Sequence, residues 1–187
     1  IDKIGLAGMT GAVMRTGGGG GLSAEQVDAE LEQFAADVSI GIGRQSGSAS
    51  LDILSKDVKR GLEIFAGLIR TPAFDPARVE LVKLQAIEGI RRRQDNPGSI
   101  VGREFAKMLY GAAHPSARES SLDSVTRITR DDLVTFHHNT IHPNGMILGV
   151  TGDFKRDEMV ASLRKVFGNW KKGMVPELRI VDVPEAE

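Results

Sequence analysis

Helix-start signals recur along this sequence and limit it to a series of short helices. Two have the spacing of a capping box, and two place Asp or Asn before a proline that fits the first helical turn. These signals are Ser23 with Gln26, Thr129 with Asp132, Asp75 with Pro76, and Asn96 with Pro97. Apolar residues follow at spacings of three and four, as on one helix face. With further helices expected at 6–15, at 56–69 after a Ser55 cap, and at 153–168, the pattern predicts about seven helices.

Alternating patterns predict a β-hairpin and one further strand. Val38, Ile40 and Ile42 alternate with serine and glycine, and the alternation resumes at 49, 51 and 53 after a turn at 44–47. The apolar run 146–151 is too short for a helix and fits a central strand covered on both faces. Three strands are fewer than an open sheet usually has. We therefore expect an α+β fold whose amino-terminal strands are missing from this chain.

Composition excludes several classes of protein. The 187 residues suit one domain, and 24 basic against 25 acidic side chains give a net charge of -1, which argues against attraction to nucleic acid or to an anionic membrane. Without cysteine there is no disulfide, thiolate zinc site or cysteine nucleophile. No apolar run approaches the ~18 to 20 residues of a membrane span. Because 175–187 is rich in proline and acid, we expect a domain at 1–174, truncated at its start, and a linker at 175–187 toward an absent second domain.

An ordered series of short motifs resembles one half of the insulinase and mitochondrial processing peptidase superfamily, over about residues 2–170. The motifs include Gly5-Leu6-Ala7, Arg15-Thr16-Gly17-Gly18, Leu54-Ser55-Lys56-Asp57, Pro72-Ala73-Phe74, Asp95-Asn96-Pro97, Leu109-Tyr110-Gly111 with His114-Pro115, Pro143-Asn144 and Gly152-Asp153-Phe154. The resemblance implies a mainly antiparallel sheet covered on one face by helices. It also implies two such domains that close around a peptide.

The positions of the family's zinc motif hold no zinc ligand in this sequence. That motif, H-x-x-E-H, supplies two imidazoles and a general base, and a later glutamate completes the metal site. Its five positions correspond to Gly8, Met9, Thr10, Gly11 and Ala12. The later ligand falls at about Gly89, or at Glu88 if the register differs by one residue. We therefore expect no catalytic residue and no zinc in this domain. One interpretation of Gly8 and Gly11 is that they keep a groove wall clear for a peptide or partner. The other is that small residues simply filled these positions after the metal was lost.

The histidines are the nearest alternative to a ligand cluster. His138 and His142 are four residues apart, which on a helix would place both on one face with His137 beside them. No acidic residue lies at motif spacing to complete a metal site. The simpler interpretation is that these histidines lie near a helix end, where a partly positive ring suits the helix dipole. His114, before Pro115, is expected to be a loop residue.

Three other features have a structural and a functional interpretation. The glycine run 17–21 lacks the Gly-Lys-Ser/Thr of a phosphate loop and is expected to be a mobile connector. The run 91–93, with Arg103 beyond it, predicts a solvated helix face, or alternatively a docking surface for an acidic partner. Trp170 is expected to pack over the sheet edge. No G-x-S-x-G nucleophile motif is present.

Two functions from different classes follow from these observations. The first is a non-catalytic domain that forms the substrate-binding or structural half of a peptidase chamber, with zinc in another domain or subunit and a peptide or unfolded protein as ligand. The second is a structural subunit of a larger complex with no role in proteolysis. A third possibility places the zinc motif in a second repeat of the same polypeptide.

Overall fold

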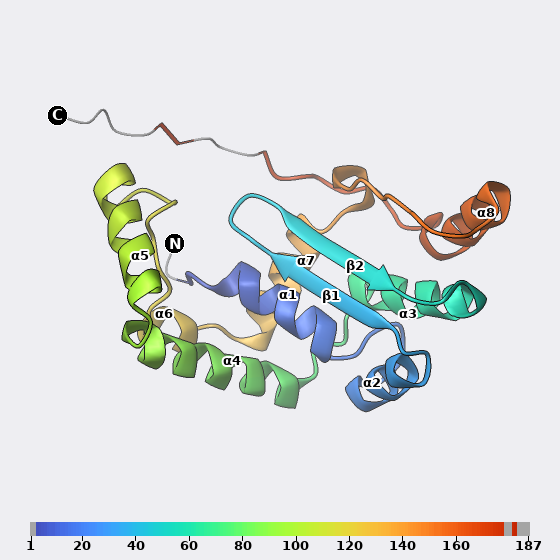
Figure 1. The fold of residues 1–187 in the computed structure, drawn as a ribbon, viewed down its shortest axis with the longest axis horizontal. Helices are drawn as coiled ribbons and strands as arrows, with labels where there is room; N and C mark the ends of the chain where they lie inside the picture. The colour runs from blue at the N-terminus through green and yellow to red at the C-terminus, as the bar shows by residue number, and fades with distance from the viewer. Residues whose placement is uncertain (1–2, 178–180, 183–187) are drawn as a thin grey trace.

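The computed structural model describes residues 3–177 and 181–182, which form a helix-rich α+β fold (Figure 1). The helices are α1 (Leu6–Thr16), α2 (Ala24–Gln33), α3 (Val58–Arg70), α4 (Pro76–Arg91), α5 (Pro97–Tyr110), α6 (Leu122–Thr126), α7 (Arg130–Thr140) and α8 (Arg156–Phe167). Short 3-10 turns lie at Ser55–Asp57, Arg92–Gln94 and Pro143–Gly145. Among the described helices, none combines the length and the apolar character that crossing a membrane requires.

Local capping accounts for most helix starts. The Ser23 and Thr129 capping boxes form, and the carboxylate of Asp75 accepts a hydrogen bond from the backbone N–H of Arg78 at 3.0 Å. The side chain of Asn96 accepts one from Ser99 N at the same distance. These four predicted starts are confirmed, because each side chain satisfies an N–H group that the first helical turn leaves unpaired.

The predicted hairpin is confirmed as β1 (Asp37–Ile42) paired antiparallel with β2 (Gly47–Asp52). One face carries Val38 opposite Leu51, and Val38 is buried against the helices. The other face is polar and exposed, with the hydroxyls of Ser39 and Ser50 at 2.9 Å. Helices therefore cover one face of the sheet, and α1 lies along β1 (Figure 1).

The core has two clusters. The first surrounds α1 and joins it to α4, α6 and α7; its buried members are Met9, Val13, Met14, Phe74, Val79, Val82, Val125, Ile128 and Leu133. The second joins α2, β1 and α3; its buried members are Val27, Leu31, Val38, Ile64, Phe65, Leu68 and Ile69. Trp170 packs against this second cluster, stacked on Phe167 with the guanidinium of Arg70 5.9 Å from its ring.

The glycine run 17–21 is a packed turn, so the expectation of a mobile connector is wrong. Gly20 N donates to Thr71 O at 3.1 Å. A β-carbon on Gly19 would lie 2.8 Å from Gly67 O, and one on Gly20 would lie 2.9 Å from Gly67 Cα. Glycine is required here because the turn lies directly against the backbone of α3.

Other departures from the sequence-based expectations are local. The run 146–151 forms no strand and pairs with none among the described residues, and Ile147 is 102% exposed, so the prediction of a covered central strand is wrong. An extended segment without a neighbouring strand has no partner for its backbone groups. Helix α6 was not predicted, and α8 begins at Arg156 rather than Asp153. The Ser55 hydroxyl donates to Asp153 O instead of capping α3.

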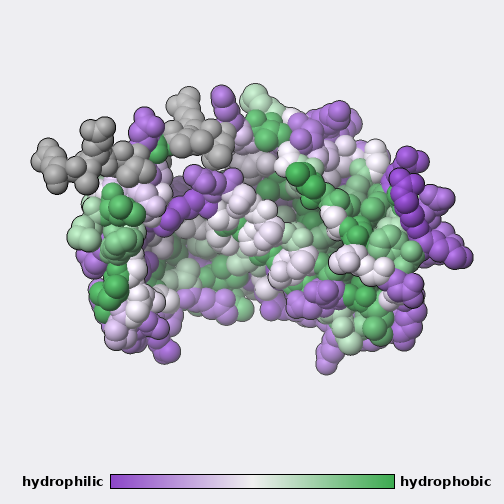
Figure 2. Space-filling view, turned by 45° about the horizontal axis from the view of Figure 1, so that its top comes forward, coloured by the Kyte–Doolittle hydropathy of each residue, from purple (hydrophilic) through white to green (hydrophobic). Residues whose placement is uncertain are grey.

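Helix α5 stands apart from both clusters. None of its residues is buried, and Met108 is 80% exposed. Figure 2 shows apolar side chains gathered over α5 at the left of the molecule, with the surface hollowed between α5 and the rest of the domain.

Candidate functional site

The five residues at the zinc-motif positions lie on α1, within the first core cluster. Gly8 is exposed, Met9, Thr10 and Gly11 are buried, and Ala12 is half-buried. The Thr10 hydroxyl donates to Leu6 O at 2.9 Å, so its one donor is already used within the helix. None of these side chains offers the imidazole nitrogen or carboxylate oxygen that zinc requires.

The two glycines of α1 differ in what surrounds them. A β-carbon on Gly11 would lie 3.0 Å from Ile42 N and 3.3 Å from Ile42 Cγ1, so α1 contacts β1 there without space for a side chain. A β-carbon on Gly8 would meet only Ile42 O, at 4.0 Å. Close packing of the helix on the strand therefore explains why residue 11 is a glycine. Packing does not require a glycine at residue 8, which is exposed.

The expected later ligand position lies on the exposed side of α4. A β-carbon on Gly89 has no heavy atom within 4 Å. The neighbouring Glu88 accepts a hydrogen bond from Arg92 Nε at 2.7 Å and is close to Arg91. In the part of the chain that the structure describes, no three His, Asp or Glu side chains come together as a metal site would require. The residues present therefore do not fit zinc.

The histidines are not brought together. His137 is partly buried, its Nε2 lies 2.7 Å from Ile69 O, and its ring contacts Phe74 edge-on. Burial lowers the pKa of His137 below its usual value, despite the raising effect of the Ile69 carbonyl. His138 is exposed on α7, whereas His142 follows the end of that helix, so these two do not share a helical face. His114 is a loop residue, as expected, stacked on Tyr110.

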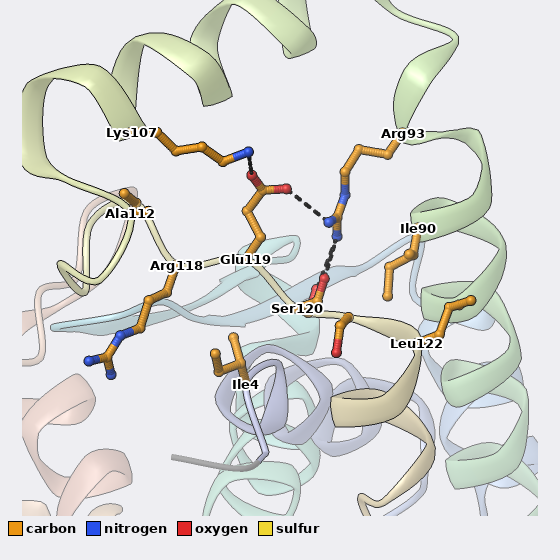
Figure 3. Close-up of a pocket in the computed structure, with 11 residues that line it drawn as sticks. Ile4, Ile90, Arg93, Lys107, Ala112, Arg118, Glu119, Ser120 and Leu122 are labelled. Carbon is orange, nitrogen blue, oxygen red and sulfur yellow. Dashed lines mark hydrogen bonds and ion pairs between the residues drawn. The ribbon is translucent and has the colours of Figure 1, made fainter.

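A basic hollow lies between α4, α5 and the loop 111–121, with a volume of about 490 Å³ (Figure 3). Its centre is Glu119, which is only 22% exposed. Arg93 Nη1 lies 2.9 Å from Glu119 Oε2, Arg103 Nε lies 3.4 Å from the same oxygen, and Lys107 Nζ lies 3.1 Å from Oε1. Arg93 also donates to Ser120 O at 2.8 Å. The carboxylate thus holds α4, α5 and the loop together.

This arrangement divides the predicted basic run into two parts. Arg91 and Arg92 are solvated on the end of α4, as expected for a charged helix face, whereas Arg93 and Arg103 turn toward the hollow. Glu104 and Glu119 hold the pKa of Lys107 above its usual range. Sequence reasoning did not identify Glu119, because its three partners lie 12 to 26 positions away in the sequence.

At alternate residues of the hairpin, the backbone N–H and C=O groups point away from the partner strand, toward the outer edges. Gly43 N donates to Ser46 O at 2.8 Å, so by alternation the groups of Ile40 and Ala49 point away from the shared ladder. On the same edge of β1, Arg15 Nε donates to Val38 O at 2.7 Å. Ile40 and Ala49 have no backbone partner among the described residues outside the hairpin.

Comparison with known proteins connects this geometry to a family. The family model described as the peptidase M16 inactive domain matches residues 127–187. An uncharacterized zinc protease of Mycobacterium leprae is 31% identical over 119 residues, which is 63% of this chain and 26% of that protein. The crystal structure of a peptidase M16 inactive domain from Pseudomonas fluorescens superposes with a TM-score of 0.79 at 26% identity, over 98% of this chain and 44% of that one. The chain belongs to the M16, or insulinase, superfamily. It is a domain of the type without the zinc motif.

Other M16 proteins are similar over comparable lengths. The uncharacterized zinc protease YmfH of Bacillus subtilis is 24% identical over 135 residues, which is 71% of this chain and 31% of that protein. The structure of the first half of the periplasmic protease PqqL from Escherichia coli shares the fold, with a TM-score of 0.80 at 17% identity over 98% of this chain and 41% of that one. The chain therefore spans less than half the length of these M16 relatives.

Proposed function

We propose that this domain is the substrate-binding half of a two-part M16 peptidase unit whose zinc lies in another domain or subunit. The observation that carries the proposal is the state of α1. This helix keeps its place in the core against β1, α4 and α7, yet Gly8, Gly11 and Ala12 provide no ligand atom. At Gly11 the contact with Ile42 leaves no room for one. Metal-dependent hydrolysis then depends on ligands from elsewhere.

The relatives support a second domain. Two solved M16 structures are more than twice as long as the part that this chain matches, at 44% and 41% coverage. We infer that residues 1–174 form one domain and that 175–187 link it to the next. The relatives from Mycobacterium leprae and Bacillus subtilis are named as zinc proteases, and we assign the zinc of this unit to the companion.

An extended peptide is the ligand that the hairpin fits. On the outer edge of β1, Arg15 of α1 already bonds Val38 O, whereas on the outer edge of β2 the backbone groups of Ala49 point outward. An added strand pairs with such groups without a particular side-chain sequence. A substrate-binding half needs this tolerance, because a peptidase holds the main chain of its substrate in an extended form. A purely structural subunit has no such requirement.

Two measurements test the proposal. Hydrolysis of a long unfolded peptide is measured with this protein alone, with a companion that carries H-x-x-E-H, and with the two combined; we expect turnover to need the companion and to rise when both are present. The control is a companion whose motif glutamate is changed to glutamine. Peptidase turnover by this chain alone, or absence of any association with the companion, contradicts the proposal.

Strand pairing is tested with the peptide rather than the protein. A peptide with N-methyl groups on alternate residues lacks the donors that a β-ladder needs, while its side chains are unchanged. We expect it to bind much more weakly than the unmodified peptide. Equal affinities refute strand addition, and no affinity for either peptide favours the structural alternative.

A further inference from the structure

The basic hollow has more positive than negative side chains around it. Around it lie the cations of Arg93, Arg103, Lys107 and Arg118 and the carboxylates of Glu104 and Glu119, so cations exceed carboxylates by two. The whole chain has a net charge of -1, so this excess is local. Like charges held close together repel one another unless an anion joins them. The hollow is therefore suited to a negatively charged group.

The cations of the hollow differ in what they contact. Lys107 Nζ lies 2.9 Å from Glu104 Oε1 and 3.1 Å from Glu119 Oε1, so its charge is held between two carboxylates. Arg118 Nε donates to Ala113 O at 2.8 Å, and no carboxylate among the described residues lies within ion-pair distance of Arg118. Figure 3 shows its guanidinium turned away from Glu119. Its terminal nitrogens can then engage a carboxylate through two parallel hydrogen bonds.

The hollow has the size and lining of a side-chain pocket. Its volume of about 490 Å³ exceeds what one ordered ion needs. Apolar side chains cover part of the wall and can contact the methylene groups of an acidic residue; they are Ile4, Ile90 and Leu122. Ser120 and Ser121 add hydroxyl groups at the same wall.

The hollow is also tied to the hairpin. Arg44, in the hairpin turn, donates from Nη1 to Ser116 O at 2.8 Å and from Nη2 to Arg118 O at 3.3 Å. The loop that carries Arg118 is thereby fixed at the tip of the two strands. A peptide that lies along the hairpin has one end directed toward this tip.

We propose that the basic hollow binds a carboxylate of the extended peptide, from an acidic side chain or from the carboxyl terminus. This inference rests on the proposed function and gives it a substrate preference: peptides with an acid at the end that passes the hairpin tip. Arg118 is the residue that contacts the carboxylate, and Lys107 adds positive charge to the lining of the same hollow. Glu119 holds the surrounding cations in place and sets the depth of the hollow.

The test measures peptide affinity of the intact protein by fluorescence anisotropy. Three unstructured peptides of one sequence are compared: an acidic one, one with every Glu replaced by Gln, and the neutral one with an amidated carboxyl terminus. We expect the acidic peptide to bind about tenfold more tightly than the Gln peptide, a typical effect of one charge-assisted contact. Raising the salt from about 0.05 to about 0.5 M should reduce this ratio. A loss confined to the amidated peptide assigns the site to the carboxyl terminus instead.

Two variants and a matched control locate the effect. Arg118→Gln and Lys107→Gln each remove one cation of the hollow, and we expect each to lower the preference for acid while the neutral peptide binds as before. Arg164→Gln removes an exposed arginine of α8 that has no ion pair among the described residues, and it should leave the preference unchanged.

The outcomes separate the two proposals. Equal affinity for the acidic, Gln and amidated peptides overturns the carboxylate site but leaves peptide binding intact. A preference for acid that survives the Arg118→Gln, Lys107→Gln double variant places the site elsewhere and also overturns it. No binding of any peptide contradicts the proposed function itself, and the carboxylate site with it.

Discussion

Replacement of Gly11 by alanine tests how closely α1 packs on β1. The added β-carbon would lie 3.0 Å from Ile42 N, 3.3 Å from Ile42 Cγ1 and 3.4 Å from Gly41 C. Alanine favours a helix over glycine by about 0.8 to 1.0 kcal/mol, whereas overpacking a filled interior costs about 1 to 3 kcal/mol. Two of the three contacts are with the backbone of a paired strand, which cannot move without disturbing β2. We therefore expect the free energy of unfolding to fall by about 1 kcal/mol.

Two other glycines provide matched controls for this substitution. A β-carbon on Gly89 meets nothing within 4 Å, and one on Gly8 meets only Ile42 O at 4.0 Å. Both lie within helices, so Gly89→Ala and Gly8→Ala should each stabilise the fold by about 0.5 to 1 kcal/mol. Urea unfolding followed by far-ultraviolet circular dichroism gives the midpoints, with an unchanged slope showing that only stability differs. A Gly11→Ala variant as stable as Gly89→Ala would refute the close contact and the reasoning built on it.

Three further predictions concern charged and titrating groups. Glu119→Gln should lower the free energy of unfolding by about 1 to 3 kcal/mol in urea titrations, because three cations lose their shared carboxylate; an unchanged midpoint speaks against its role. Lys3 lowers the pKa of Asp132 to about 2, from 3.8, so this carboxylate contributes stability above pH 3.8 that is lost as the pH falls toward 2, and Asp132→Asn should remove that part of the pH profile. Burial lowers the pKa of His137 below 6.5, so the unfolded chain binds its proton first and stability should fall as the pH drops below 6.5, but less so in His137→Gln.

Helix starts could be predicted from the sequence because their causes are local. The side chains of Asp75 and Asn96 bond to backbone groups three residues later, so the residue type and the following proline suffice. The hairpin was equally accessible, because alternation of Val38, Ile40 and Ile42 with small residues specifies one buried face.

Features that depend on distant partners could not be predicted in this way. The run 146–151 has the composition of a central strand, but strand formation depends on a neighbouring strand that the described residues do not supply. The glycine run 17–21 resembles a flexible connector until Gly67 of α3 is placed against it.

The candidate site shows the same division. The absence of zinc ligands at Gly8, Gly11 and Ala12 follows from residue type once the motif is aligned. The contact of Gly11 with Ile42 needs the packed structure. Glu119 carried no sequence signal, because a single glutamate in a loop acquires its meaning only when Arg93 and Lys107 converge on it.

Metal stoichiometry tests the central claim most directly, namely that α1 supplies no ligand to zinc. Zinc is counted by mass spectrometry after dialysis, first for this protein alone and then for its complex with a companion that carries H-x-x-E-H. We predict zinc in the complex, and none bound by this chain. One tightly held zinc per chain in the absence of the companion, lost when residues of α1 are substituted, would contradict the claim.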